Sequence, residues 1–115
     1  EIVNLTKNTL IHSAAHITGG GLVNNLTRSI PEHLCKNLDL AKIKIKKIFK
    51  WIKSNNITDT EMLKTFNCSV GFCLVAKKNN VKKIKKYFTK DFMPYEIGYI
   101  SKSKKKINVY NKIKW

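Results

Sequence analysis

Apolar side chains recur at helical spacing in three parts of the chain, with lysines opposite them in two of the three. The apolar faces are Leu22, Val23, Leu26 and Ile30; Ile45, Ile48, Phe49 and Ile52; and Val81, Ile84 and Phe88. Pro31 ends the first of these helices, because proline lacks the backbone donor that a helix interior requires. The pattern therefore predicts three amphipathic helices, and the first residues of the chain also look like the end of a helix.

A fourth helix is predicted by a capping box at residues 58–61. Thr58 stands three residues before Glu61, so the threonine hydroxyl can accept from the Glu61 N–H while the carboxylate reaches back to the cap. Ile57 and Met62 occupy the two positions of a hydrophobic staple around this box. The local chemistry thus fixes where this helix begins.

Four segments predict strands. Residues 11–17, 95–100 and 107–110 are short and apolar or alternating in character. Residues 69–76 are almost continuously apolar, which predicts a central strand covered on both faces. Helices and strands interleave along the chain, so we expect an α+β fold of the α/β sandwich type, with helices packed on one sheet.

The length of 115 residues suits a single domain over residues 1–115. The longest apolar run, residues 70–76, is far shorter than the roughly 20 residues of a membrane-spanning helix, so no membrane association is expected. Three cysteines do not make a disulfide framework, and they favour a reducing compartment. Neither the cysteines nor the histidines have metal-ligand spacing, so no metal site is expected. Because the chain starts at Glu1, we expect it to be part of a larger protein.

The net charge of +16 comes almost entirely from lysine, since Arg28 is the single arginine. A chain this basic is typical of proteins that bind nucleic acid, an anionic membrane or acidic ligands. Lysine is a point charge, however, whereas the forked guanidinium of arginine recognises base edges and phosphates. We therefore interpret the lysines as a solvated surface and expect no specific nucleic-acid binding, and a basic nucleic-acid-binding module remains the alternative.

Three consecutive glycines, Gly19, Gly20 and Gly21, join the predicted strand at residues 11–17 to the helix that follows. Glycine in regular structure costs about 0.5–1 kcal/mol relative to alanine, so a run of three calls for a reason. Bare backbone at the start of a helix presents unpaired N–H groups that suit a phosphate or carboxylate. Thr18 and His16 add a hydroxyl and a titratable ring at the same strand end. A tight turn without any ligand is the alternative.

Asn25 and Arg28 follow within two helical turns and lie three residues apart on one face. Asparagine offers a donor and an acceptor, and arginine offers a fork for an oxyanion, so both are candidate anion ligands. A surface asparagine and a solvated arginine are the alternative. Further along, Asn67 is a candidate site residue or a simple helix C-cap. Cys68 beside it is interpreted as a buried small hydrophobe rather than a nucleophile.

Taken together, these motifs are similar in order and spacing to one known family from about residue 11 to residue 100. The segments are AHITGGG at 15–21, NLTR at 25–28, IPE at 30–32, IFKW at 48–51 and EMLKTFNCSVG at 61–71. They resemble the C-terminal domain of phosphoribosylformylglycinamidine cyclo-ligase, also called aminoimidazole ribonucleotide synthetase. The glycine run and the EMLKTFNC stretch are far more specific together than either is alone.

The resemblance implies an ATP-dependent ligase that closes the imidazole ring of formylglycinamidine ribonucleotide in purine biosynthesis. It implies a three-layer α/β/α domain with one mixed sheet, and an N-terminal domain outside this chain that carries most of the ATP and Mg²⁺ ligands. It also implies a homodimer when full length and a cytoplasmic location. On this basis we expect the isolated 115 residues to be inactive.

The same resemblance implies roles for individual residues. Thr18, Gly19, Gly20, Gly21, Asn25, Arg28 and Asn67 would bind substrate or phosphate, and His16 would be catalytic. Two residues depart from the family pattern: Thr27 stands where the family has proline, and Ser69 stands where it has glycine. A related ATP-using enzyme of the same superfamily, with a different acceptor, remains a further alternative.

Overall fold

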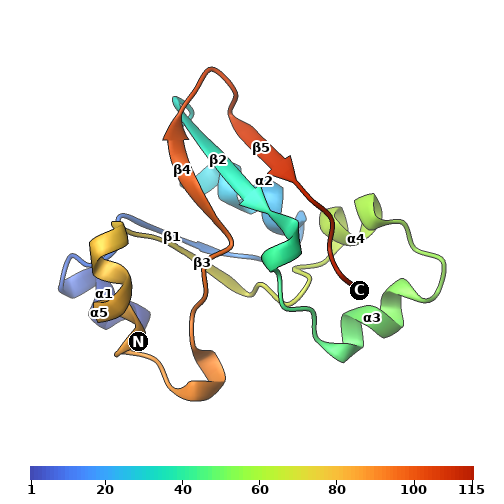
Figure 1. Ribbon diagram of the computed structural model, residues 1–115, viewed down its shortest axis with the longest axis horizontal. Helices are drawn as coiled ribbons and strands as arrows, with labels where there is room; N and C mark the ends of the chain where they lie inside the picture. The colour runs from blue at the N-terminus through green and yellow to red at the C-terminus, as the bar shows by residue number, and fades with distance from the viewer. The chain divides into compact units, whose positions relative to one another are not determined.

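The computed structural model describes residues 1–115 and consists of short helices alternating with strands (Figure 1). The helices are α1 (Ile2–Lys7), α2 (Gly21–Ser29), α3 (Lys47–Lys53), α4 (Asp59–Thr65) and α5 (Val81–Lys85), with 3-10 turns at Leu40–Lys42, Lys78–Asn80 and Lys90–Phe92. The strands are β1 (Ser13–His16), β2 (Leu34–Asp39), β3 (Phe72–Val75), β4 (Gly98–Lys102) and β5 (Ile107–Tyr110). The chain divides into two compact units, residues 1–14 with 74–95, and residues 15–73 with 96–115.

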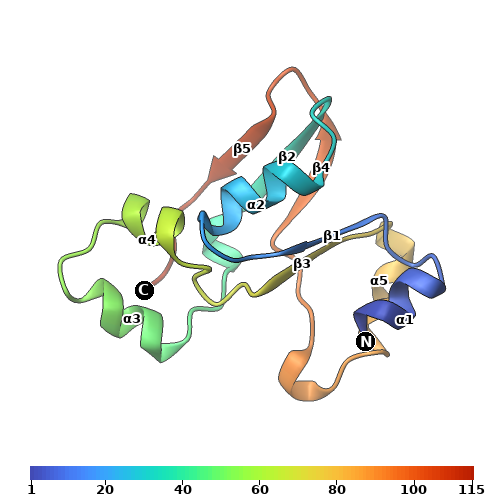
Figure 2. The same ribbon diagram turned by 180° about the vertical axis from the view of Figure 1, so that it is seen from behind.

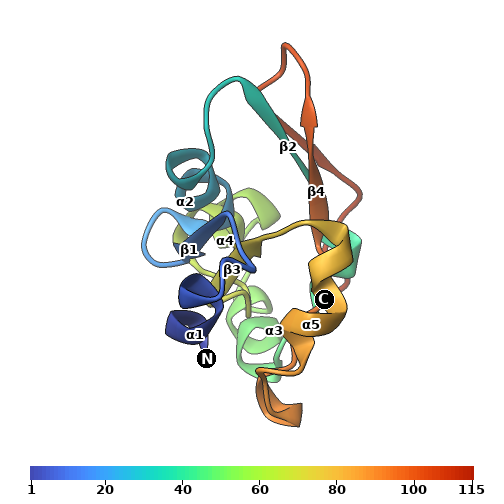
Figure 3. The ribbon, with the colours of Figure 1, turned by 90° about the vertical axis from the view of Figure 1, so that its left-hand side faces the viewer.

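The smaller unit contains α1 and α5, drawn in blue and orange in Figure 3. Leu5 of α1 and Ile84 of α5 are buried. The His12 N–H donates to the Val75 carbonyl, and the Asn80 side-chain amide donates to the Leu10 carbonyl. These bonds connect the first residues of the chain to the segment from residue 74 onward.

The larger unit contains a three-stranded mixed sheet in the order β4-β2-β5. The central strand β2 pairs antiparallel with β4, where Leu34 is opposite Lys102, and parallel with β5, where Lys36 is opposite Ile107. Seen from behind, α2 lies in front of this sheet (Figure 2). Buried apolar side chains from α2, β2 and α4 form the core of this unit. They include Leu22, Leu26, Cys35, Leu38 and Met62.

The strand β2 carries two polar residues in its centre. Lys36 is only 1% exposed, and its Nζ donates to the Pro31 carbonyl just beyond the C-terminus of α2, where a positive charge suits the helix dipole. Asn37 is 6% exposed, and its amide donates to the Ser101 hydroxyl on β4 and accepts from the Asn108 amide on β5. Side-chain hydrogen bonds therefore reinforce the backbone pairing of all three strands.

The expected α+β class is confirmed, and the larger sheet is mixed as expected. The strands belong to two sheets, because β1 and β3 pair separately as a two-stranded sheet. The prediction of a central strand over residues 69–76 is wrong: residues 67–70 form a turn, and β3 has one partner, so Phe72 stays exposed. The three-layer arrangement and the single domain stay predictions.

The predicted start of α4 is confirmed, since the Thr58 hydroxyl accepts from the Glu61 N–H at 3.2 Å. The reciprocal half of the capping box differs from the prediction, because the Glu61 carboxylate accepts from the Thr65 hydroxyl one turn later. Met62 is fully buried, in agreement with its staple position. None of the helices has the length and apolar character needed to cross a bilayer.

Candidate functional site

The glycine turn lies where β1 gives way to α2. Ala15 and Ile17 are buried, so the alternation of the strand leaves His16 and Thr18 exposed on the opposite side. The Gly21 N–H donates to the Thr18 carbonyl at 3.2 Å and closes the turn. The backbone N–H groups of the first turn of α2 therefore begin directly after this bend, with the partial positive charge of a helix N-terminus.

The three glycines have three different environments. Gly21 has φ +70° and is buried, and a Cβ there would overlap the carbonyl oxygen of Leu63 on α4. Gly20 has φ +94°, and the Arg28 guanidinium lies 3.6 Å from where its Cβ would be. Gly19 adjoins open space and has no positive φ. Helix packing thus explains Gly21 and backbone conformation explains Gly20, while nothing in the chain itself requires Gly19.

Asn25 and Arg28 both reach back from α2 to this turn. The Asn25 side-chain amide donates to the Gly21 carbonyl at 2.7 Å, with longer contacts of 3.4 Å to the carbonyls of Thr18 and Gly19. Asn25 therefore holds the shape of the turn. The exposed guanidinium of Arg28 lies over Gly20 and places a positive charge at the N-terminal end of α2.

Asn67 opens a tight turn between α4 and β3. The Val70 N–H donates to the Asn67 carbonyl, and the Asn67 side-chain oxygen accepts from the Ser69 N–H at 3.1 Å. The two central residues, Cys68 and Ser69, have φ of +46° and +74°. The alternative that Asn67 is a helix C-cap is not what the structure shows, because the cap residue of α4 is Phe66.

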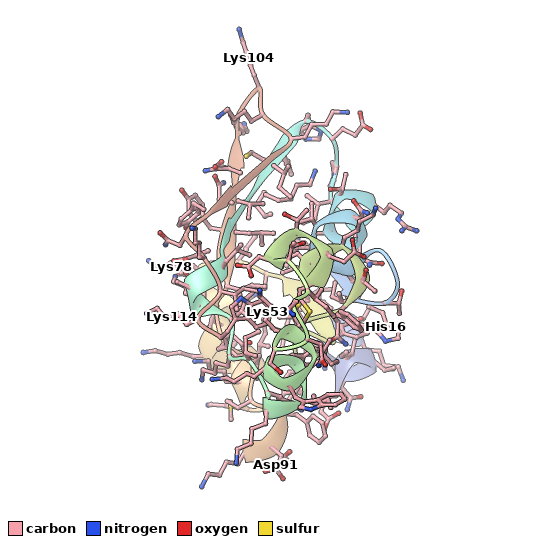
Figure 4. All side chains as sticks on the ribbon, turned by 90° about the vertical axis from the view of Figure 1, so that its right-hand side faces the viewer. His16, Lys53, Lys78, Asp91, Lys104 and Lys114 are labelled. Atoms are coloured by element: carbon pink, nitrogen blue, oxygen red, sulfur yellow. The ribbon has the colours of Figure 1, made fainter.

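The two turns meet at the same end of the β1–β3 pair. The Ile17 N–H donates to the Gly71 carbonyl at 3.0 Å, and the rings of His16 and Phe72 stack with centroids 5.6 Å apart. His16, labelled in Figure 4, lies at the end of β1 where the glycine turn begins. The sequence-predicted residues from His16 to Arg28 thus form one surface region, and the turn that starts at Asn67 adjoins it through Gly71.

The buried thiols are not suited to nucleophilic chemistry. Burial, together with the negative charge of Asp59, raises the pKa of the Cys68 thiol to about 11, and burial raises that of Cys73 to about 12. The Cys68 Sγ also contacts the Met62 carbonyl oxygen at 3.4 Å. Cys68 is only 1% exposed, so its interpretation as a buried small hydrophobe is confirmed.

No group of three or more His, Cys, Asp or Glu side chains is placed to hold a metal ion. A surface depression of about 530 Å³ lies at the other end of α2, lined by residues 27–32. It shares Arg28 with the glycine turn, but the guanidinium lies toward Gly20. The depression therefore does not enclose the predicted site residues.

Sequence reasoning missed Phe72 and Leu63, which contact the site from β3 and α4. Phe72 was assigned to a fully buried strand because its neighbours are apolar. In the structure Phe72 lies on the exposed side of β3, opposite the buried Cys73, and its ring stacks on that of His16. The contact between Gly21 and the Leu63 backbone joins residues more than 40 positions apart and leaves no local signal.

Ser69 provides a direct test of this turn. Its hydroxyl accepts from the Lys46 N–H at 2.8 Å at the start of α3, while its Cβ is strained by the positive φ. We expect Ser69→Ala to lower the free energy of unfolding by about 1 kcal/mol, because this hydrogen bond is lost and the strain stays. We expect Ser69→Gly to be close to neutral, because relief of strain offsets the lost hydrogen bond. Urea denaturation of both variants measures this difference, and equal losses would contradict it.

The chain matches the family described as AIR synthase related protein, C-terminal domain, over residues 1–110. It is 38% identical over 101 residues to phosphoribosylformylglycinamidine cyclo-ligase of Prochlorococcus marinus, covering 86% of this chain and 29% of that protein. It is 46% identical over 77 residues to the cyclo-ligase of Xylella fastidiosa, covering 66% of this chain and 22% of that protein.

A third relative is the bifunctional purine biosynthetic protein ADE5,7 of Saccharomyces cerevisiae, 38% identical over 85 residues, which cover 73% of this chain and 11% of that protein. The chain thus spans less than a third of the length of each of these relatives. The match over almost the whole chain includes the glycine turn, the Arg28 helix and the Asn67 turn. The chain belongs to the family of AIR synthase related proteins, as their C-terminal domain.

Proposed function

We propose that this chain is the C-terminal part of a phosphoribosylformylglycinamidine cyclo-ligase. The proposed reaction is the ATP-dependent closure of the imidazole ring of formylglycinamidine ribonucleotide in purine biosynthesis. The names of the relatives support it, since several are cyclo-ligases or multifunctional purine biosynthetic proteins. We extend the proposal to a cytoplasmic enzyme that forms a homodimer when full length.

In this proposal, the glycine turn and Arg28 bind the phosphate of the ribonucleotide. The observation that carries the proposal is the position of the Arg28 guanidinium above Gly20, at the positive end of α2. Two positive features, the Arg28 guanidinium and the N-terminus of α2, then lie at the same end of this helix. The open space beside Gly19 leaves room for an anion to approach the backbone.

The remaining residues have supporting roles. Asn25 donates to the carbonyl oxygens of the turn and so helps to hold the turn in the conformation that an anion would meet. Thr18 contributes an exposed hydroxyl beside Gly19, and Asn67 shapes the neighbouring turn. His16 stands at the edge of the same region and is the proposed catalytic group, in position to hold or move a proton of the substrate during ring closure.

ATP would supply the phosphoryl group that activates the amide oxygen of the substrate, and that oxygen leaves as phosphate when the ring nitrogen attacks. We assign no Mg²⁺ ligand to this chain, because no acidic cluster suited to a divalent cation is present. The proposal places the Mg²⁺ ligands and most ATP contacts in an N-terminal domain that partners this one. The task of the present residues is to bind and orient the ribonucleotide.

A chimera tests this function. In it, the present chain replaces the 101 aligned residues of the Prochlorococcus marinus cyclo-ligase. We expect the chimera to catalyse ring closure, and Arg28→Ala to raise the KM for the ribonucleotide about 10- to 100-fold, as the loss of a charged hydrogen-bond pair predicts. Steady-state kinetics with varied ribonucleotide measures this effect.

Two controls make the result interpretable. Arg28→Lys keeps the charge but not the fork, so we expect an intermediate KM. Lys104→Ala changes one charge at the exposed tip between β4 and β5, where Lys104 extends away from the ribbon in Figure 4, and should leave the KM unchanged. A folded chimera without activity, or an unchanged KM in Arg28→Ala, would count against the proposed function and the proposed site respectively.

A further inference from the structure

His16 and Phe72 form a stacked ring pair at the edge of the glycine turn. Their centroids are 5.6 Å apart and their planes are inclined by 20°, which is the geometry of offset stacking. The two residues come from neighbouring strands, and the Ile17 N–H to Gly71 carbonyl bond holds the backbones side by side immediately next to them. The contact therefore joins the end of β1 to the beginning of β3.

The exposure of Phe72 needs a physical reason. Its side chain is 43% exposed, while the next residue, Cys73, is buried, so the strand turns Phe72 outward. More than half of the side chain is nevertheless covered, and the ring contact of Phe72 is its stack with the His16 imidazole. The stacked contact restricts the His16 ring, while a half-exposed Phe72 contributes less to the buried core than a fully buried phenylalanine would.

We propose that Phe72 is a positioning residue that fixes the imidazole plane of His16 relative to the glycine turn. This inference rests on the proposed function of His16 as the catalytic group. The outer torsion of a histidine side chain has a broad minimum, so an exposed imidazole without a neighbour samples many orientations. Stacking on Phe72 narrows that range and keeps one ring edge directed toward the bound ribonucleotide, where a proton must be transferred in a defined geometry.

Nuclear magnetic resonance on the full 115-residue chain tests the contact without any ligand. A ring stacked on Phe72 shifts the carbon-bound imidazole protons of His16 upfield. We expect Phe72→Leu to abolish that shift, and Phe72→Tyr, which keeps the aromatic ring, to retain it. His12 and His33 are also exposed and serve as internal references whose signals should not move. An unchanged amide spectrum elsewhere confirms that the variant is folded.

Kinetics in the chimera separate positioning from a merely structural role. We expect Phe72→Leu to lower kcat about 10- to 100-fold with little change in the KM for the ribonucleotide, because binding is left to Arg28 and the turn. Phe72→Tyr should restore most of kcat. If Phe72→Leu leaves the His16 signals in place, or moves them without lowering kcat, the inference is overturned.

The resonance measurements and the kinetics together also distinguish failure of this inference from failure of the proposed function. A parent chimera that is folded but inactive defeats the proposed function, and with it the catalytic role assigned to His16. The resonance shifts then still decide whether Phe72 sets the orientation of that ring. An active chimera in which Phe72→Leu is indistinguishable from the parent defeats only the positioning role.

Discussion

Gly21→Ala should lower the free energy of unfolding by about 4 kcal/mol, among the largest effects of a single substitution. The added Cβ would overlap the Leu63 carbonyl oxygen, which is backbone and cannot rotate away. The positive φ of +70° adds about 1 kcal/mol of strain for any residue with a Cβ. Relief requires α2 and α4 to separate, which would expose the buried side chains of Leu22 and Met62. Urea denaturation followed by circular dichroism measures the loss.

Gly19→Ala is the matched control for this prediction. The position adjoins open space and has no positive φ, so we expect a change within about 0.5 kcal/mol. The two variants differ by two positions in the same turn and add the same methyl group. Equal destabilisation by both would show that the turn, rather than the contact with α4, determines the cost.

Alkaline pH should destabilise the fold through its buried thiols. The pKa of Cys68 is raised from 9.0 to about 11 and that of Cys73 to about 12, so in the unfolded chain both ionise at lower pH than in the native state. Above pH 9 the unfolded state therefore binds fewer protons, and stability falls as the pH rises toward the native values. Only above pH 9 does each thiol lower the free energy of unfolding by as much as about 1.4 kcal/mol per pH unit, so we expect the two thiols together to lower it by roughly 3 kcal/mol between pH 8 and pH 10.

Urea denaturation at a series of pH values measures this slope. Lysines also begin to lose their charge in this range, so the cysteine contribution is read from the difference between the parent and the Cys73→Ala variant. That variant should be less stable at pH 8 because a buried side chain is shortened, but its stability should fall less steeply with pH. Parallel slopes for parent and variant would contradict the assignment to Cys73.

Local chemistry identified much of the secondary structure. The Thr58 cap placed the beginning of α4 at the correct residue, since its signal lies within four consecutive positions. The apolar faces predicted α2, α3 and α5, although α3 and α5 in the structure are shorter than their apolar patterns. Signals confined to a few neighbouring residues were therefore sufficient for these elements.

The strand β2 was missed because its centre is polar. Lys36 and Asn37 interrupt the apolar pattern, and their side chains bond to partners outside the strand, among them Pro31, Ser101 and Asn108. Because β2 was not predicted, the other strands were assigned to one sheet. In the structure β2 pairs with β4 and β5, and these three strands form a sheet separate from β1 and β3. Pairing between residues distant in sequence leaves no trace in local hydrophobicity.

The residues around the glycine turn were identified from the sequence, but their separate contributions were not. All three glycines were interpreted as serving an anion, and the structure shows that Gly21 also meets the backbone of α4. Asn25 was expected to bind substrate or phosphate, which stays a prediction, and the structure adds that its amide nitrogen donates to carbonyls of the turn. Residue type and spacing predict which segment forms the candidate site. The contacts of each residue within that segment depend on the tertiary structure.

The polar centre of β2 also bears on the synthesis of the chain. Asn37 finds its partners on β4 and β5 only 64 and 71 residues later. At translation rates of about 5–20 residues per second, β2 emerges roughly 3 to 14 seconds before the sheet can close around it. An unpaired apolar strand invites aggregation during such a delay, and a charged lysine in its middle discourages that association. On this argument, the lysine that is buried in the folded sheet would disfavour association of the nascent chain while its charge is still in water.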